Sequence, residues 1–424
     1  MSKDSRHIHI IGVGGIGTSA LAQYYLANGQ VVSGSDASSS EITDHLKNLG
    51  IKVFIGHEPE NVRGADEIIH SAAVKEGNPE YDAAKAERIP TKLYAEAMSE
   101  ITKDYRLIAI SGSHGKSTTT SMVAKILIDA GLDPTVIVGT KMHELGGNNF
   151  RSGKSEYFVL EADDYNRHFH NYFPTITVVT NIDREHLDIY KDLAGVKEAF
   201  LQFLKNTKQG GTIIANGQDK NTVDVVAQAD LMHNTIVLYN EHDTSAHDLA
   251  VPGNHNQSNA EAAYWVAKTL GVADATIRQS LSGFRGSWRR LEELTEGVYT
   301  DYAHHPTEIK ATLQALKSAN PTKKLVCVFQ PHQRDRLTQL FADFAGSFGD
   351  ADELYLIPLY AVRGRDDGSG KSSQQLAELI KKPQAMYKNS FAQAYKAVSP
   401  KFDPEHIVVF MGAGDIDEQL RAKL

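Results

Sequence analysis

The sequence has only one cysteine and no long apolar run. These two features argue against a disulfide-stabilised protein and against a membrane-spanning one. With one thiol, Cys327, no disulfide can form within the chain, which is typical of a reducing compartment. Cys327 lies in the apolar run Leu325–Phe329, which predicts a small buried side chain. No apolar stretch approaches the roughly 20 residues that span a bilayer, and the N-terminal residues do not resemble a signal peptide. We therefore expect a cytoplasmic protein outside the membrane.

The chain also lacks an excess of positive charge. It has 44 Lys and Arg against 53 Asp and Glu, a net charge of −9. An acidic protein gains nothing from the phosphate field of nucleic acid, so no DNA or RNA partner is expected. Apolar residues make up 41% and charged residues 23%, as in ordinary globular proteins. At roughly 100–200 residues per domain, the length predicts two to four domains.

Short apolar runs alternate with amphipathic helical segments, a pattern typical of α/β proteins with parallel sheets. New domains are expected to begin at three places: His7–Ile11, Leu107–Ile110 and Gly283–Arg290. The first two are strands that run into glycines, and the third is a stretch where glycines and arginines interrupt a helical pattern. The predicted domains therefore cover residues 1–105, 106–284 and 285–424.

A first glycine-rich loop follows the strand His7–Ile11 and precedes a predicted helix at Thr18–Ala27. It has the pattern G-x-G-x-x-G, with Gly12, Gly14, Gly15, Ile16 and Gly17. Such glycines let the backbone approach a diphosphate, and the helix N-terminus supplies amide donors. Asp36, 19 residues beyond Gly17, is placed to accept hydrogen bonds from ribose hydroxyls. Alone the motif is weak, because it most often binds NAD or FAD and in some chains only forms a tight turn.

A second phosphate loop follows the strand Leu107–Ile110. Its residues are Gly112, Ser113, His114, Gly115, Lys116 and Ser117, and Thr118 begins the next helix. The loop lacks the first glycine of G-x-x-x-x-G-K-[ST], because position 110 is Ile. Loop amides would still cradle the β-phosphate, Lys116 would neutralise phosphate charge, and the Ser117 hydroxyl would bind Mg²⁺. A nucleoside triphosphate is therefore predicted here.

Two further strand ends carry candidate metal ligands. Glu161 follows the strand Phe158–Leu160, where acidic residues hold the ion in P-loop enzymes. His186 lies just past the strand Thr177–Thr180, within Asn181–Asp188. A lone histidine is usually structural, but three consecutive strand ends carry the loop, the acid and the histidine in order. We predict that Ser117, Glu161 and His186 bind Mg²⁺.

The two loops together indicate two nucleotides. A dehydrogenase needs only the first loop and a simple ATPase only the second. A protein with both is expected to bring a nucleotide-tagged substrate to ATP, although the residues alone do not name the tag.

At this point the chain resembles the Mur ligases of peptidoglycan synthesis, and within them the branch that adds L-alanine. The resemblance runs from Ile10 to Ile416 and rests on many motifs in the same order. Beyond the loops above, these are Gly253–Asn256 with Asn259 and Ala260, Arg289–Glu292, Asp301–Glu308, Phe329–His332 and Gly412–Ile416. The string Asp-Tyr-Ala-His-His-Pro-Thr-Glu at Asp301–Glu308 is the most telling for that branch.

The resemblance implies three domains: a Rossmann-like domain for a UDP-sugar, a central P-loop ATPase-type domain with a parallel or mixed sheet, and a Rossmann-like domain for the amino acid. It implies ATP and Mg²⁺ as cofactors, UDP-N-acetylmuramate and L-alanine as substrates, and a monomer or weak homodimer. It places His70 and Ser71 near the UDP-sugar. It also implies that ATP is contacted by His255, Asn256, Asn259, Arg290 and Asp301.

The implied reaction converts the sugar carboxylate to an acyl phosphate, which the amine then attacks. Lys116, Glu161 and His186 would carry the phosphoryl step. His304 and His305 lie near the expected amine, mainly as positioning groups and secondarily as bases, unless they only cap a helix or fill the core. Arg336 and Arg363 match family arginines and would bind the amino-acid carboxylate, unless they are ordinary surface arginines.

The chain departs from the family pattern in three places. Tyr165 and Asn166 replace Ser and Asp after the metal-binding acid, Arg336 is the only residue retained from the string R-Y-T-R-T, and the stretch between Asn216 and Gly253 is short. These differences bear on the choice of amino acid, for which glycine and L-serine remain alternatives, more than on the reaction type.

Three rival functions would each explain part of the sequence. A related ligase that attaches a preformed tripeptide during cell-wall recycling usually has a different first loop. A nicotinamide-dependent oxidoreductase leaves Glu161 and His186 unexplained. A non-catalytic nucleotide-binding relative would have no need of the intact Lys116, Ser117, Glu161 and His186.

Overall fold

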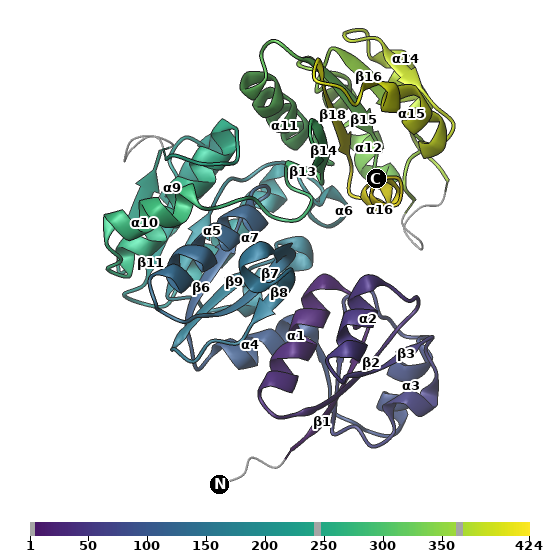
Figure 1. Cartoon of the computed structure of the whole chain (residues 1–424). Coiled ribbons are helices and arrows are strands. Elements are labelled where there is room, and N and C mark those ends of the chain that lie inside the picture. The colour runs from purple at the N-terminus through teal and green to yellow at the C-terminus, as the bar shows by residue number, and fades with distance from the viewer. Residues whose placement is uncertain (1–4, 241–246, 362–367) are drawn as a thin grey trace. The chain divides into compact units, whose positions relative to one another are not determined.

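The computed structural model describes residues 5–240, 247–361 and 368–424. These residues form two compact units. The first unit comprises Met1–Ile182, Val196–Tyr239 and Ala262–Ser280, and the second comprises Asp183–Gly195, Asn240–Glu261 and Leu281–Leu424. Three sheets, each with flanking helices, make up the described chain (Figure 1), which confirms the predicted α/β class. No helix in the described ranges is long and apolar enough to cross a bilayer.

The first sheet is all parallel, with the order β3-β2-β1-β4-β5. Its central strand, β1, is buried from Ile8 to Ile11, as expected for a strand that is covered on both faces, although it carries the polar His9 among its isoleucines. The side chain of Asn78 accepts hydrogen bonds from two first-turn amides of α3, and Pro79 stands at the first helical position. The elements are β1 His7–Ile11, α1 Ile16–Ala27, β2 Val31–Asp36, α2 Glu41–Asn48, β3 Lys52–Ile55, β4 Glu67–His70, α3 Pro79–Ala86, β5 Thr91–Leu93 and α4 Tyr94–Thr102.

The second sheet has the order β12-β11-β10-β6-β9-β7-β8, and only β8 runs antiparallel to its neighbour. The predicted strands at Leu107–Ile110, Phe158–Leu160 and Thr177–Thr180 lie side by side as β6, β9 and β10, so their carboxyl ends share one sheet edge. The elements are β6 Arg106–Ser111, α5 Lys116–Asp129, β7 Thr135–Met142, β8 Asn148–Arg151, β9 Tyr157–Glu161, β10 Ile176–Val179, α7 Leu193–Lys205, β11 Thr212–Asn216, α8 Lys220–Gln228, β12 Thr235–Tyr239 and α10 Asp274–Ser282. Helix α5 begins at Lys116, two residues before the predicted start, because Gly115 adopts the left-handed conformation that turns the loop into the helix.

The third sheet has the order β13-β14-β18-β15-β16-β17, with β13 antiparallel to β14. Alternate residues of β15 enter two separate apolar clusters: Cys327 packs on one face and Val328 on the other. Helix α11 covers the first face, and helices α15 and α16 cover the second. The elements are α6 Leu187–Tyr190, β13 Glu292–Thr295, β14 Val298–Asp301, α11 Pro306–Ala319, β15 Lys324–Phe329, α12 Arg334–Gln339, α13 Phe341–Ala345, β16 Glu353–Leu356, α14 Ser373–Leu379, β17 Ala385–Tyr387, α15 Phe391–Val398, β18 His406–Met411 and α16 Ile416–Arg421. Helix α9, Asn254–Thr269, has residues in both units.

Candidate active site

The first glycine-rich loop borders a cavity of about 470 Å³ at the carboxyl edge of the first sheet. Four of the predicted UDP-sugar residues line it: Gly12, Gly15, Asp36 and Ser71. Asp36 also braces the loop, because its Oδ2 accepts a hydrogen bond of 2.9 Å from the amide of Gly14. The cavity therefore lies where a diphosphate and a ribose were expected.

The other predicted residues of this region, Gly14, Ile16, Gly17 and His70, are not among the residues that line the cavity. Ile16 and Gly17 begin helix α1. The ring of His70 packs edge-on against Tyr81 at 5.1 Å, and its Nδ1 bonds to the carbonyl of Ser71 at 3.0 Å, so its placement favours a supporting part.

His57 is a lining residue that the sequence did not single out. Its Nδ1 lies 3.1 Å from the Ser35 hydroxyl and 3.4 Å from the buried carboxylate of Glu80. Burial works to raise the pKa of Glu80, but the nearby ring of His9, at 3.6 Å, and hydrogen bonds from Ser35 and Asn61 hold this pKa below its ordinary value.

The second phosphate loop is held in shape by the strand beside it. The amides of Ser113 and His114 donate to the carbonyl and to the side-chain oxygen of Asn181, both at 2.9 Å. The Thr180 hydroxyl donates to the carbonyl of His114 at 2.6 Å, and a Cβ at Gly112 would collide with this hydroxyl. Ser113 and His114 thus shape the loop, while the first-turn amides of α5 lack carbonyl partners within the helix and could bind an anion.

Lys116 is paired with an acid that sequence reasoning missed. Its Nζ donates to Asp164 Oδ1 at 2.8 Å and to the carbonyl of Gly112 at 2.6 Å. Asp164 is only 1% exposed. Burial works to lower the pKa of Lys116, but Asp164 and the nearby carboxylates of Asp163 and Glu161 raise this pKa above its ordinary value. Lys116 is therefore a buried cation whose counter-ion is Asp164.

Ser117 and Glu161 form the expected pair of oxygen ligands. The Ser117 hydroxyl donates to Glu161 Oε1 at 2.9 Å, and the amide of Gly139 donates to Oε2 at 2.6 Å. A Cβ at Gly139 would come within 2.8 Å of the same carboxylate, so only glycine allows this approach. A hydroxyl and a carboxylate are hard oxygen donors of the kind that Mg²⁺ prefers, so the residues fit this ion.

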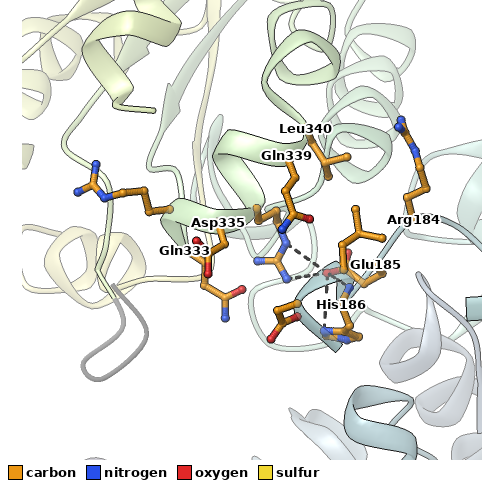
Figure 2. A pocket seen from close by; sticks show the side chains of 11 residues that line it. Arg184, Glu185, His186, Gln333, Asp335, Gln339 and Leu340 are labelled. Atoms are coloured by element: carbon orange, nitrogen blue, oxygen red, sulfur yellow. Dashed lines mark hydrogen bonds and ion pairs between the residues drawn. The ribbon is translucent and has the colours of Figure 1, made fainter. Parts of the chain in front are cut away.

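In the second unit, Glu185 and Arg336 form a buried ion pair (Figure 2). Arg336 donates from Nη2 at 2.6 Å and from Nε at 3.2 Å, and both bonds end on Glu185 Oε1. Burial works to raise the pKa of Glu185, but Arg336, His186 and His305 hold it well below its usual range. His186, the predicted third metal ligand, follows Glu185 directly and precedes helix α6 with a left-handed backbone.

His304 and His305 stand at the start of helix α11. The ring of His305 caps the helix: its Nδ1 accepts the amide proton of Thr307 at 3.3 Å, and its Nε2 donates to the carbonyl of Arg184 at 3.2 Å. Both ring nitrogens are thus engaged in this state. Burial lowers the pKa of His304 to about 3. The imidazole of His304 is therefore neutral at pH 7 and a weak base, which favours a positioning part for both histidines.

Among the predicted ATP residues of the second unit, Arg290 and His255 interact electrostatically. Arg290 pairs with Glu308 at 3.3 Å and stacks over Tyr302 at 5.1 Å. Burial, together with the nearby Arg290, lowers the pKa of His255 to about 4. Asn256 and Asn259 are buried in the first turns of α9, where Asn256 donates to the carbonyl of Pro252 at 2.7 Å.

Asp301 is turned inward. Its two oxygens accept the amide protons of Leu291 at 2.7 Å and Ala303 at 2.8 Å. Burial raises the pKa of Asp301. In this state Asp301 braces its own domain, and its contact with ATP stays a prediction. Arg363, predicted to bind the amino-acid carboxylate, lies outside the described residues.

The three sheets and the two glycine-rich loops are typical of one class of protein, the α/β nucleotide-binding proteins, here with a P-loop in the central sheet. Family models agree over most of the chain. The Mur ligase family catalytic domain matches residues 7–106, the Mur ligase middle domain residues 110–267, and the Mur ligase glutamate ligase domain residues 289–414. The chain belongs to the Mur ligase family, which confirms the resemblance drawn from its motifs.

Its relatives resemble it over nearly their full length. A UDP-N-acetylmuramate–L-alanine ligase of Clostridium tetani is 39% identical, with 97% of this chain and 96% of that protein covered. One from Alkaliphilus metalliredigens is 36% identical over 97% and 95%. The crystal structure of the UDP-N-acetylmuramate–alanine ligase of Thermotoga maritima superposes with a TM-score of 0.80 at 29% identity, covering 98% and 97%. A murein peptide ligase of Psychrobacter arcticus shares the fold, with a TM-score of 0.73 at 22% identity over 99% and 98%.

Proposed function

We propose that this chain joins L-alanine to the carboxylate of UDP-N-acetylmuramate at the expense of ATP, a step of peptidoglycan synthesis. One observation carries the proposal: Lys116, Ser117 and Glu161 meet at the phosphate loop of a chain that matches ligases of that name from end to end. The cytoplasmic location and the monomer or weak homodimer expected from the sequence remain predictions.

The reaction follows from the weakness of a carboxylate as an electrophile. A carboxylate oxygen of the sugar attacks the γ-phosphorus, the bond to the β–γ bridging oxygen breaks, and ADP leaves. The amine nitrogen then attacks the acyl carbon, the carbon–oxygen bond to phosphate breaks, and the amine loses a proton as the amide forms. ATP thus supplies a phosphate leaving group in place of oxide.

Each residue of the phosphate loop has a task in the first step. Lys116 moves from Asp164 to the β- and γ-phosphate oxygens and offsets their charge. Ser117 and Glu161 would hold Mg²⁺, with His186 as the proposed third ligand, and the ion would supply Lewis-acid stabilisation of the transferring phosphoryl group. The first-turn amides of α5 orient the phosphates. His255, Asn256, Asn259 and Arg290 are proposed to contact the adenine and ribose.

The nucleotide of the sugar is proposed to lie in the cavity at Gly12, Gly15, Asp36 and Ser71. Its volume, about 470 Å³, falls within the range of small-molecule sites. The incoming amino acid is proposed to bind at Arg336, with His304 and His305 fixing the walls around its amine.

The test is phosphate release from purified protein with ATP, Mg²⁺ and UDP-N-acetylmuramate, with and without L-alanine. Release should require both substrates and should vanish in Lys116→Ala. Lys125→Ala is a matched control on the same helix, because Lys125 pairs with Asp129 on the surface at 2.8 Å. Release with a tripeptide but not with L-alanine would assign the chain to cell-wall recycling. A folded, ATP-binding protein that releases no phosphate with any amine would overturn the proposal.

A further inference from the structure

The ion pair between Glu185 and Arg336 lines a small cavity in the second unit. The cavity lies between the start of α6 and the helix α12, and Gln333, Gln339 and Leu340 also line it. Figure 2 shows Glu185 among the lining residues, with dashed lines that mark its hydrogen bonds and ion pairs. Both residues are nine-tenths buried or more, at 5% and 9% exposed. Because the ion pair is buried and borders the cavity, its charges are available to a molecule in the cavity and are shielded from bulk water.

Each partner keeps part of its bonding capacity. Both hydrogen bonds from Arg336 end on Oε1 of Glu185, and among the described residues no donor bonds to Oε2. Nη1 of Arg336 is buried and has no hydrogen-bond partner within the described ranges. A buried donor without a hydrogen bond costs free energy of folding, because it has lost its bond to water. A bound group that accepts a hydrogen bond from Nη1 would recover that free energy. One anionic acceptor and one cationic donor therefore remain available side by side.

This arrangement is the complement of a zwitterion. A free α-amino acid presents an ammonium and a carboxylate on one carbon, so it offers three donors to an anion and two acceptors to a guanidinium. The cavity volume is about 30 Å³, room for about two water molecules, so the charged groups of an amino acid would enter it while the rest of the molecule lies outside.

We infer that Glu185 binds the ammonium of the incoming amino acid while Arg336 binds its carboxylate. The inference rests on the proposed function and extends it, because the sequence pointed only to Arg336 at this site. Glu185 acts here as a binding residue that selects a zwitterion over an uncharged or purely anionic competitor. It also holds the amine nitrogen close to His305 and His304, whose rings interact electrostatically with the same carboxylate.

The experiment compares L-alanine with L-lactate, which has the same carbon skeleton and a hydroxyl in place of the ammonium. The KM for L-alanine and the inhibition constant of L-lactate are measured in the wild type and in Glu185→Gln, with ATP and UDP-N-acetylmuramate saturating. A charge-assisted hydrogen bond is lost only for L-alanine, so its KM should rise about 10–100-fold. The inhibition constant of L-lactate should change less than about threefold, because lactate makes no ammonium contact. The KM values for ATP and for the sugar nucleotide should stay within the same margin.

Two controls separate binding from folding. Asp352→Asn removes a carboxylate of the same unit that lies outside the cavity lining and pairs with Lys317 at 2.8 Å, and it should leave the ratio of the two constants unchanged. Because Glu185→Gln leaves Arg336 buried without its counter-ion, it risks misfolding. In that case the double variant Glu185→Gln/Arg336→Gln, which removes both charges, should fold and should bind L-alanine no better than L-lactate.

The outcomes are distinct. If the constants for L-alanine and L-lactate rise by the same factor, or if neither changes, the pair is only structural and the inference is wrong. If the wild type shows no L-alanine-dependent phosphate release at all, the proposed function fails instead. A selective loss of L-alanine in an otherwise active enzyme supports both.

Discussion

We expect Asp164 to neutralise Lys116 in the free protein and to be displaced from it when the phosphates of ATP bind. The variant Asp164→Asn tests this expectation. Lys116 and Asp164 are 2.8 Å apart, with side chains 16% and 1% exposed. At an effective dielectric constant of about 20, two unit charges at this distance attract by about 6 kcal/mol, much of which is offset by their desolvation. Removing one partner of such a buried pair costs about 3–5 kcal/mol. Lys116 keeps its bond to the carbonyl of Gly112, so we expect the lower end, about 3 kcal/mol.

The loss of stability in Asp164→Asn should appear only in the protein without bound nucleotide. ATP has to displace Asp164 from Lys116 in the wild type but displaces no anion in Asp164→Asn, so the affinity for ATP should rise at least about tenfold in the variant. Thermal unfolding of the free protein should begin several degrees lower, and saturating ATP should restore most of the difference. The assays are thermal unfolding and calorimetric titration with ATP, both with and without Mg²⁺.

A neighbouring aspartate supplies the control. Asp163 is 49% exposed and lies 3.4 Å from His168, so Asp163→Asn should change neither quantity by much. If Asp164→Asn bound ATP more weakly than the wild type, Asp164 would contribute to ATP binding. The expectation that ATP displaces Asp164 from Lys116 would then be refuted. Equal unfolding temperatures in the free proteins would show that the pair contributes no stability.

Three further outcomes are expected. Glu161→Gln should lower the rate of phosphate release about 10²–10³-fold, in the manner of removing one preorganised electrostatic contact, and excess Mg²⁺ should not rescue it; full activity would exclude Glu161 as a ligand. Gly112→Ala should abolish ATP binding because its Cβ collides with Thr180, whereas Gly131→Ala, also at positive φ but with open space around it, should cost only about 1 kcal/mol and keep ATP binding; equal effects in titrations would contradict this. Burial lowers the pKa of His304 to about 3 against about 6.5 unfolded, so only the unfolded chain gains a proton between these values, and stability is lost as pH falls through 6.5 toward 3. Between pH 6.5 and 5 the loss is about 2 kcal/mol, and His304→Gln should reduce it in denaturant titrations at the two pH values.

The sequence was informative wherever a strand runs directly into a motif. Apolar runs of strand length predicted β1, β6, β9 and β15, and the α/β class followed from their alternation with helices. Because parallel strands end at one sheet edge, the order of the phosphate loop and Glu161 along the chain was enough to place them together. Family motifs, rather than local physics, predicted what each nucleotide carries.

Pairings between distant side chains could not be predicted in this way. Glu185 and Arg336 are 151 residues apart, and no periodicity relates them. Asp164 bonds to Lys116 from the turn after β9, just before Asn166 and Arg167, which adopt left-handed conformations that non-glycine residues rarely take. The sequence placed both acids near functional neighbours but gave no sign that each was already an ion-pair partner.

The capping role of His305 is indicated by the sequence Asp301–Glu308 itself. A polar residue before Pro306, with Glu308 three residues on, is the signature of a capped helix start. The prediction of a histidine near the amine competed with that capping alternative, and the structure shows the cap. A role at the amine therefore depends on what the other face of the ring contacts when substrates bind.

The lone thiol has a practical consequence. Cys327 is fully buried in β15, and burial raises its pKa, so it should be nearly inert toward alkylating reagents at neutral pH. A cysteine introduced on the surface would then be the sole reactive position, with no need to remove native thiols. Pairs of such cysteines, one in each compact unit, could carry spectroscopic labels that follow the distance between the units through every stage of turnover.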